Sequence, residues 1–265
     1  MAGRAGRRGI DKEGFVIPMI NFEILKFGYI GELSKGDLEP IKSMFRLSYN
    51  TVINLIRQYS KKESVTILKN SFFQFQNKTK KYKIQNLFER KLNVLKKNGY
   101  IDEYYNLTSK GEFLSKIYTE SLVVSEIFTA DDILDYTALE LFFLISSIIY
   151  EPGKKVKFMF RKKDFKEADE ILNKFKNGSF VYAYFENKNA RKLYPFVKLW
   201  FKAEIGFVEL MEYTNMQEGN VIRLFRMAID LIFQIINATD NDELKERLKY
   251  IVYTIEREYV KFEEF

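Results

Sequence analysis

The chain has 265 residues, a formal net charge of +7, and 43 basic residues interspersed with 36 acidic ones. This length predicts one or two domains, and the charge weakly favours a polyanionic partner. The absence of Cys and His excludes disulfides, thiolate zinc sites, cysteine nucleophiles and histidine acid–base chemistry. The sequence also lacks a GxxxxGK[ST] loop, so we expect no nucleotide or metal site built by this chain alone.

Glycine-flanked arginines open the chain, in the run Gly3-Arg-Ala-Gly-Arg-Arg-Gly9. Arg4 and Arg7 are three residues apart, so one helical turn would direct both guanidinium groups to the same side. Planar, permanently charged guanidinium groups suit a phosphate site, and glycine lets the backbone pack closely behind them. The run therefore predicts contacts with phosphate.

The next segments predict little regular structure. Residues 14–20 are typical of a short buried strand, with Pro18 at an edge or an end. Residues 21–42 contain three glycines and Pro40 and are typical of a linker. The longest apolar run, Leu141 to Tyr150, is too short to cross a bilayer. We expect no membrane contact and a cytoplasmic location.

Residues 43–117 predict a winged-helix domain. Three stretches carry apolar residues at helical spacing, and the third begins at Ile84 and ends at the C-cap signal Asn98-Gly99. Two short extended pieces follow around residues 102–103, and Thr108 is placed to cap a closing helix. Three helices, a hairpin and a closing helix are the elements of that domain.

Residues 118–265 carry no convincing strand signal and predict an all-helical domain, so the fold class is mainly α. Two turn signals, Pro152-Gly153 and Asn177-Gly178, separate the helices, and the basic run from Lys154 to Lys163 is a loop or a helix start. Helices are expected near 118–128, 131–150, 164–176, 190–203, 206–213, 218–238 and 241–262.

The helix expected at 218–238 is apolar except for one narrow polar line, formed by Arg223, Arg226, Asp230, Gln234 and Asn237. These residues recur at steps of three or four, so they share one side of the helix. The line faces either solvent, as in many amphipathic helices, or a channel that carries a strand. Its mixed charge fits passage of a strand better than tight phosphate binding.

Four segments in order resemble one family. The glycine–arginine run resembles the last conserved motif of superfamily-two helicases, in the form found in superkiller-type RNA helicases. Residues 43–56 and the motif Ser71-Phe-Phe-Gln-Phe-Gln76 are similar to parts of that family's winged-helix domain. Residues 218–226 resemble the start of the "ratchet" helix in its C-terminal DSHCT domain. The chain is thus expected to be the C-terminal part of an ATP-dependent RNA helicase, beginning inside the last helicase motif.

The resemblance implies three parts: the tail of a second RecA-like domain with a linker (1–42), a winged-helix domain (43–117) and a DSHCT-like helical bundle (118–265). The first part would supply the arginine finger, Arg7, supported by Arg4. ATP and Mg²⁺ would be bound only in the intact parent protein, and this chain alone is expected to be inactive. Only residues 77–83 occupy the place of the family's arch insertion, so we expect no arch.

In the helical bundle, the resemblance implies contacts with single-stranded RNA. Arg223 matches the leading arginine of the ratchet helix, a second family arginine falls at Met227, and a family glutamate falls at Asp230. Arg226 could supply the cation that Met227 does not provide, and Gln234 continues the line. The implied partners are single-stranded RNA, the N-terminal RecA-like helicase domains and RNA-decay nucleases.

Two other functions fit parts of the sequence. One is a stand-alone winged-helix regulator that binds duplex DNA, although the expected recognition helix, 84–97, is too apolar to offer many side chains to a groove. The other is a catalytically silent scaffold.

Overall fold

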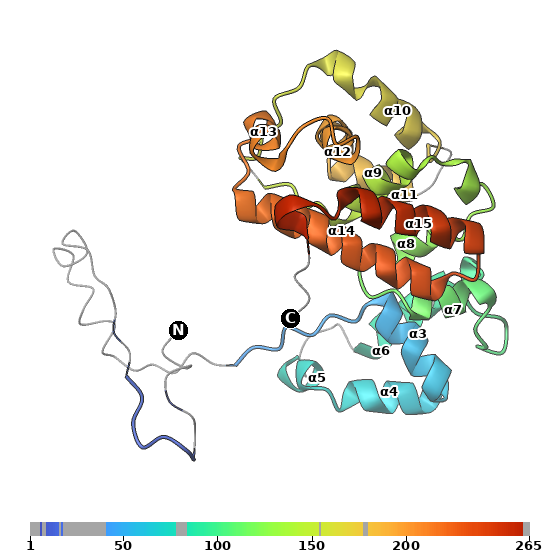
Figure 1. Cartoon of the computed structure of the whole chain (residues 1–265). Coiled ribbons are helices and arrows are strands. Elements are labelled where there is room, and N and C mark those ends of the chain that lie inside the picture. The colour runs from blue at the N-terminus through green and yellow to red at the C-terminus, as the bar shows by residue number, and fades with distance from the viewer. Residues whose placement is uncertain are drawn as a thin grey trace. The chain divides into compact units, whose positions relative to one another are not determined.

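The computed structural model describes residues 41–77, 84–153, 155–176 and 180–261, together with residues 6, 9–15 and 17 (Figure 1). The chain divides into two compact units, residues 1–43 and 44–265. The described part is mainly α-helical, as predicted. Its strand pairing is limited to two isolated antiparallel bridges, Ile101–Leu107 and Phe158–Thr214.

The described residues of the first unit form no helix or strand. Phe15 and Ile17 are 81% and 88% exposed, so the buried strand predicted at 14–20 is wrong for the residues described there. A strand needs a pairing partner, and none of the described residues of this unit provides one. Arg4, Arg7 and residues 18–40 lie outside the described residues.

The second unit begins with five helices around a small hydrophobic core. They are α3 (Tyr49–Gln58), α4 (Lys61–Lys69), α5 (Phe72–Gln76), α6 (Ile84–Lys97) and α7 (Ser109–Ser115). Ser48, Ser60, Ser71 and Thr108 cap α3, α4, α5 and α7, because each hydroxyl accepts a backbone N–H of the first turn. The core contains Val52, Ile53, Phe88, Leu92, Leu95, Tyr100 and Leu114. The place expected for an arch lies largely outside the described residues, in 78–83.

The turn between α6 and α7 agrees with its sequence signals. Helix α6 ends at Lys97, and Gly99 has a φ of +73°, which glycine adopts without strain. The Thr108 hydroxyl accepts the N–H of Gly111 at 3.2 Å and donates to the carbonyl of Gly99 at 2.7 Å. A Cβ at Gly111 would lie 2.1 Å from the carbonyl oxygen of Tyr100, so this close packing requires glycine. The boundaries predicted for the three parts, and the winged-helix assignment of 43–117, stay predictions.

A larger core holds the remaining helices. These are α8 (Ser121–Phe128), α9 (Ala138–Ile149), α10 (Lys166–Asn173), α11 (Phe180–Asn187), α12 (Tyr194–Phe201), α13 (Phe207–Leu210), α14 (Glu218–Ala238) and α15 (Asp242–Ile255), with short 3₁₀ turns η2 (Ile133–Asp135), η3 (Lys162–Phe165), η4 (Ala190–Lys192), η5 (Met211–Tyr213) and η6 (Glu258–Val260). Every residue from Leu141 to Ile149 is buried, and α9 packs against α12, α14 and α15. Figure 1 shows α14 and α15 side by side, in orange and red.

The helical predictions differ from the structure in several places. The helices predicted at 131–150 and 190–203 are each divided, into η2 and α9 and into η4 and α12. Helix α11 was not predicted, because aromatic and β-branched residues have low helix propensity and Asn177-Gly178 suggests a turn. Burial of Val181 and Phe185 in the core stabilises the helix nevertheless. The helix predicted at 241–262 ends at Ile255, and the chain then turns back across the bundle. No helix among the described residues is long and apolar enough to span a membrane.

Candidate functional site

Helix α14 carries the predicted polar line on one side and core residues on the other. Arg223, Arg226 and Asp230 are exposed, and Met227 and Gln234 are partly buried. The opposite side is buried, with Val221, Leu224, Phe225, Ala228, Leu231, Ile232 and Ile235 in the large core. The helix spans 218–238, as predicted. Its polar side could therefore meet a ligand while its apolar side fixes its position.

Arg223 is one of the exposed charged residues of this line. It lies between two depressions, of about 210 Å³ and about 450 Å³, that share Arg223 and Met227 as lining residues. Within the described part of the chain, the Arg223 side chain makes no hydrogen bond or ion pair. Glu151 is the carboxylate that lines the smaller depression, and Asp230 lines the larger one. The guanidinium is thus placed to bind an anionic or hydrogen-bonding ligand from outside.

Arg226 has a different environment, although it is one turn further along α14. Its Nη2 donates to the carbonyl oxygens of Tyr259 at 3.0 Å and Lys261 at 3.1 Å, and its Nε donates to Val260 at 3.4 Å. These bonds tie the segment that follows α15 to α14. The guanidinium therefore has a structural role, and an RNA contact by Arg226 stays a prediction.

Gln234 and Asp230 form a second tie. The Oε1 of Gln234 accepts the backbone N–H of Tyr118 at 2.9 Å, and its Nε2 donates to Oδ2 of Asp230 at 2.8 Å. Tyr118 lies between α7 and α8, so this amide joins α14 to the connection between the two hydrophobic cores. The same residues were predicted as ligand contacts, which nothing in the described structure tests.

The N-terminal half of α14 is held by aromatic rings. Phe225 stacks on Trp200 with ring centroids 5.4 Å apart and on Phe196 at 6.1 Å. Such pairs add to the stabilisation from burial alone. Arg223, two residues before Phe225, therefore projects from a rigid scaffold.

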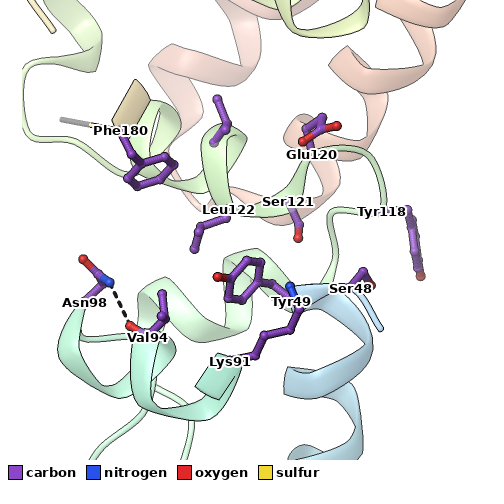
Figure 2. A pocket seen from close by; sticks show the side chains of 11 residues that line it. Ser48, Tyr49, Lys91, Val94, Asn98, Tyr118, Glu120, Ser121, Leu122 and Phe180 are labelled. Atoms are coloured by element: carbon purple, nitrogen blue, oxygen red, sulfur yellow. Dashed lines mark hydrogen bonds between the residues drawn. The ribbon is translucent and has the colours of Figure 1, made fainter. Parts of the chain in front are cut away.

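A second candidate site, absent from the sequence analysis, is a cleft of about 750 Å³ between the two cores. Figure 2 shows Tyr49 and Lys91 on one side of it and Leu122 and Phe180 on the other. Lys91 Nζ lies 3.6 Å from the centre of the Tyr49 ring, a favourable cation–π geometry. Burial and the nearby charge of Arg90 lower the pKa of Lys91, and burial raises the pKa of Tyr49. Its lining residues come from α3, α6, α8 and α11, far apart in sequence, so no local motif marks it.

The described residues contain no group of three or more metal-binding carboxylates. Arg4 and Arg7, the predicted catalytic pair, lie outside the described residues.

Comparison with known proteins places these features in a family. Residues 104–263 match the DSHCT (NUC185) domain, which is more than half of the chain. The chain belongs to the DSHCT family. The match begins in the turn before α7 and includes all of the larger bundle, so α14 and its polar line are part of the DSHCT domain.

Several relatives of this DSHCT protein are named as RNA helicases. It is 36% identical over 121 residues to the DExH-box ATP-dependent RNA helicase DExH9 of Arabidopsis thaliana, and this match covers 44% of this chain and 12% of the relative. It is 44% identical over 78 residues to the exosome RNA helicase MTR4 of Homo sapiens, a match that covers 29% of this chain and 7% of the relative. It is 46% identical over 57 residues to the antiviral helicase SKI2 of Saccharomyces cerevisiae, a match that covers 22% of this chain and 4% of the relative. The resemblance to superkiller-type RNA helicases is confirmed. The matched region spans only about an eighth or less of these relatives.

Proposed function

We propose that this chain is the C-terminal region of an ATP-dependent RNA helicase, in which α14 lines the path of single-stranded RNA as it leaves the motor. The observation that carries this proposal is Arg223. It is an exposed guanidinium on a rigid helix, without a partner among the described residues, in a chain whose relatives are RNA helicases. A cation of this kind contacts phosphate without reading sequence.

In this proposal, some residues of the polar line contact RNA and others hold α14 in position. Arg223 and Met227 contact the strand, because both line the two depressions. Arg226 and Gln234 keep the helix in place through backbone groups of Tyr259 and Tyr118. Asp230 limits the affinity by its negative charge, so that a strand can slide. Loose contact suits a surface that RNA must pass.

The rest of the chain has supporting roles in this proposal. Residues 43–117 form a winged-helix joint between the motor and the bundle, and residues 1–42 end the second RecA-like domain. Arg7 acts as the arginine finger, with Arg4 beside it. ATP and Mg²⁺ are bound by the RecA-like domains of the intact cytoplasmic protein, and RNA-decay nucleases receive the emerging strand.

An intact protein with Arg7→Ala should lose ATP hydrolysis and keep RNA binding. Unchanged ATP hydrolysis would contradict the assignment of Arg7 as the arginine finger.

The direct test is binding of the chain to single-stranded RNA and to duplex DNA of equal length across a salt series. Arg223→Glu should weaken RNA binding with no change in Tm. The matched control is Arg90→Glu, an equal change of charge at an exposed position of α6. A different result would support a winged-helix regulator that binds duplex DNA. In that case the chain prefers duplex DNA, Arg90→Glu abolishes this preference, and Arg223→Glu keeps it.

A further inference from the structure

A basic segment runs beside the start of α14. Residues 155–163 contain five cations, Lys155, Lys157, Arg161, Lys162 and Lys163, and all are exposed. Within the described part of the chain, none of their side chains takes part in an ion pair or a side-chain hydrogen bond. Two carboxylates lie nearby: Asp164, next to the segment, accepts the backbone N–H of Arg161, and Glu167 binds Lys198 of α12. The segment therefore has a local excess of positive charge.

The part of this segment around residues 157–159 is held in an extended form by residues 213–215, just before α14 begins, whereas Lys155 lies in a turn and Lys162 and Lys163 lie in η3. Phe158 and Thr214 form an antiparallel bridge, and the N–H of Met159 donates to the carbonyl of Tyr213 at 2.9 Å. The side chain of Asn215 accepts the N–H of Lys157 at 2.7 Å and donates to the carbonyl of Lys155 at 2.8 Å. The cations are thus carried by an ordered backbone.

Side chains alternate along the segment, as in a strand. Phe158 packs on Phe196 with ring centroids 5.3 Å apart, and Phe160 stacks on Tyr213 at 5.3 Å. The exposed alternate positions are Lys155, Lys157, Met159 and Arg161, three of them cations. Alternate residues of a strand are about 7 Å apart, a spacing comparable with that of neighbouring phosphates in an extended single strand.

The basic segment also adjoins Arg223. Gly153 and Val156 line the depression of about 210 Å³ together with Arg223, Met227 and Glu151. Val156 stands between Lys155 and Lys157 in the sequence, so the start of the basic segment lies near Arg223.

We propose that residues 155–163 are a second RNA-binding site of this chain, which holds the phosphates of single-stranded RNA on the side of Arg223. Recognition is electrostatic and independent of sequence, because the exposed charged groups are cations and base-reading amides are absent from residues 155–163. The location beside Arg223 rests on the proposed function, whereas phosphate binding by the segment does not.

The test compares two triple variants of the full chain. Lys155→Gln, Lys157→Gln and Lys162→Gln remove three charges from the basic segment. Lys62→Gln, Lys69→Gln and Lys97→Gln remove three exposed charges from α4 and α6. Binding of a fluorescent oligouridylate is measured across a salt series, and thermal melting verifies that both variants fold.

We expect the first variant to weaken oligouridylate binding about tenfold at low salt and to lower the slope of log Kd against log salt by about 2, since each phosphate contact contributes about 0.7. The control variant should keep both. Equal losses in the two variants, or no loss in the first, would overturn the proposal. Binding to phosphatidylserine vesicles is measured for the same variants. If the first variant loses binding to these vesicles and keeps oligouridylate binding, the proposal is also overturned, and the segment is assigned to a membrane surface. If the first triple variant weakens oligouridylate binding and Arg223→Glu does not, the RNA-binding site at residues 155–163 stands and the proposed role of α14 is rejected.

Discussion

The guanidinium of Arg257 lies 3.7 Å from the centre of the Trp200 ring, and its Nη2 donates to the carbonyl oxygens of Trp200 and Ile205, both at 3.0 Å. Trp200 in turn stacks on Phe225 of α14. The chain beyond α15 is thereby connected to α12 and, through the indole, to α14. The support of the candidate site therefore comes partly from residues that follow the last long helix.

Arg257→Met should lower the free energy of unfolding by about 2–3 kcal/mol, because two carbonyl groups lose a charged donor and the indole loses its cation–π partner. Chemical denaturation measures this change. Arg191→Met is the control, since Arg191 makes an exposed ion pair with Asp169 that is worth at most about 1 kcal/mol. Equal effects of the two substitutions would contradict the structural role of Arg257.

Arg226→Gln should release residues 259–261 from α14. Hydrogen exchange of the backbone amides of Val260 and Lys261 should become at least about tenfold faster, because Arg226 donates three hydrogen bonds to this segment and the loss of one charged hydrogen bond alone gives about that factor. Arg223→Gln should leave this exchange unchanged. If Arg226→Gln instead weakens RNA binding and leaves exchange as it was, the contact predicted from the sequence is correct and the structural role is secondary.

Asn50→Asp should destabilise the second unit by about 3 kcal/mol. The buried Nδ2 of Asn50 donates to the carbonyl oxygens of Ser115 at 2.9 Å and Ile117 at 2.8 Å, and a carboxylate would replace these bonds by repulsion. Thermal melting of the variant gives the comparison. Asn93→Asp, at an exposed position of α6, should change the Tm little; a similar loss there would argue against the interpretation.

Tyr136 should make stability sensitive to alkaline pH. Burial, aided by the charges of Asp132 and Glu140, raises the pKa of Tyr136 from 10.0 to about 12. A raised pKa gives stability that is present below pH 10 and is lost as the pH rises through 12, because the unfolded chain releases the proton first. At pH 11 this loss is about 1.4 kcal/mol.

Tyr136→Phe removes the titrating hydroxyl, so its free energy of unfolding should fall less between pH 9 and pH 11 than that of the unsubstituted chain. Measurement of urea unfolding at several pH values gives both curves. Parallel curves would show that Tyr136 ionises equally easily in the folded and unfolded states. Tyr253→Phe, which changes an exposed tyrosine, is the control and should run parallel.

Local signals predicted the helix boundaries well where capping chemistry is strong. Thr108 and Gly99 agree with the structure, because caps and turns depend on neighbouring residues. The bounds of α14 also agree, although Gln217 makes no side-chain cap hydrogen bond, because its long apolar periodicity is itself a local signal. Helix α11 was missed, since its stability comes from burial of Phe185 among distant residues. The end of α15 was misplaced for a similar reason, as contacts of Arg257 with Trp200 are invisible in local sequence.

The sequence predicted which residues of the candidate site share one side of a helix, but not which hydrogen-bond partners those residues have. Spacing alone placed Arg223 and Arg226 on one side of a helix. It could not show that Arg226 meets the carbonyls of residues 259–261, or that Gln234 binds Tyr118 more than a hundred residues earlier. The pairing of the basic segment with residues 213–215 was hidden as well, because an isolated bridge has no repeating pattern.

The burial of α9 has a consequence for synthesis of the protein. Every residue from Leu141 to Ile149 is covered in the finished fold, largely by α12, α14 and α15. All three follow α9 in the sequence, so this hydrophobic helix leaves the ribosome well before its partners exist. Until α14 emerges, a nascent chain exposes a continuous apolar surface that favours aggregation or chaperone binding.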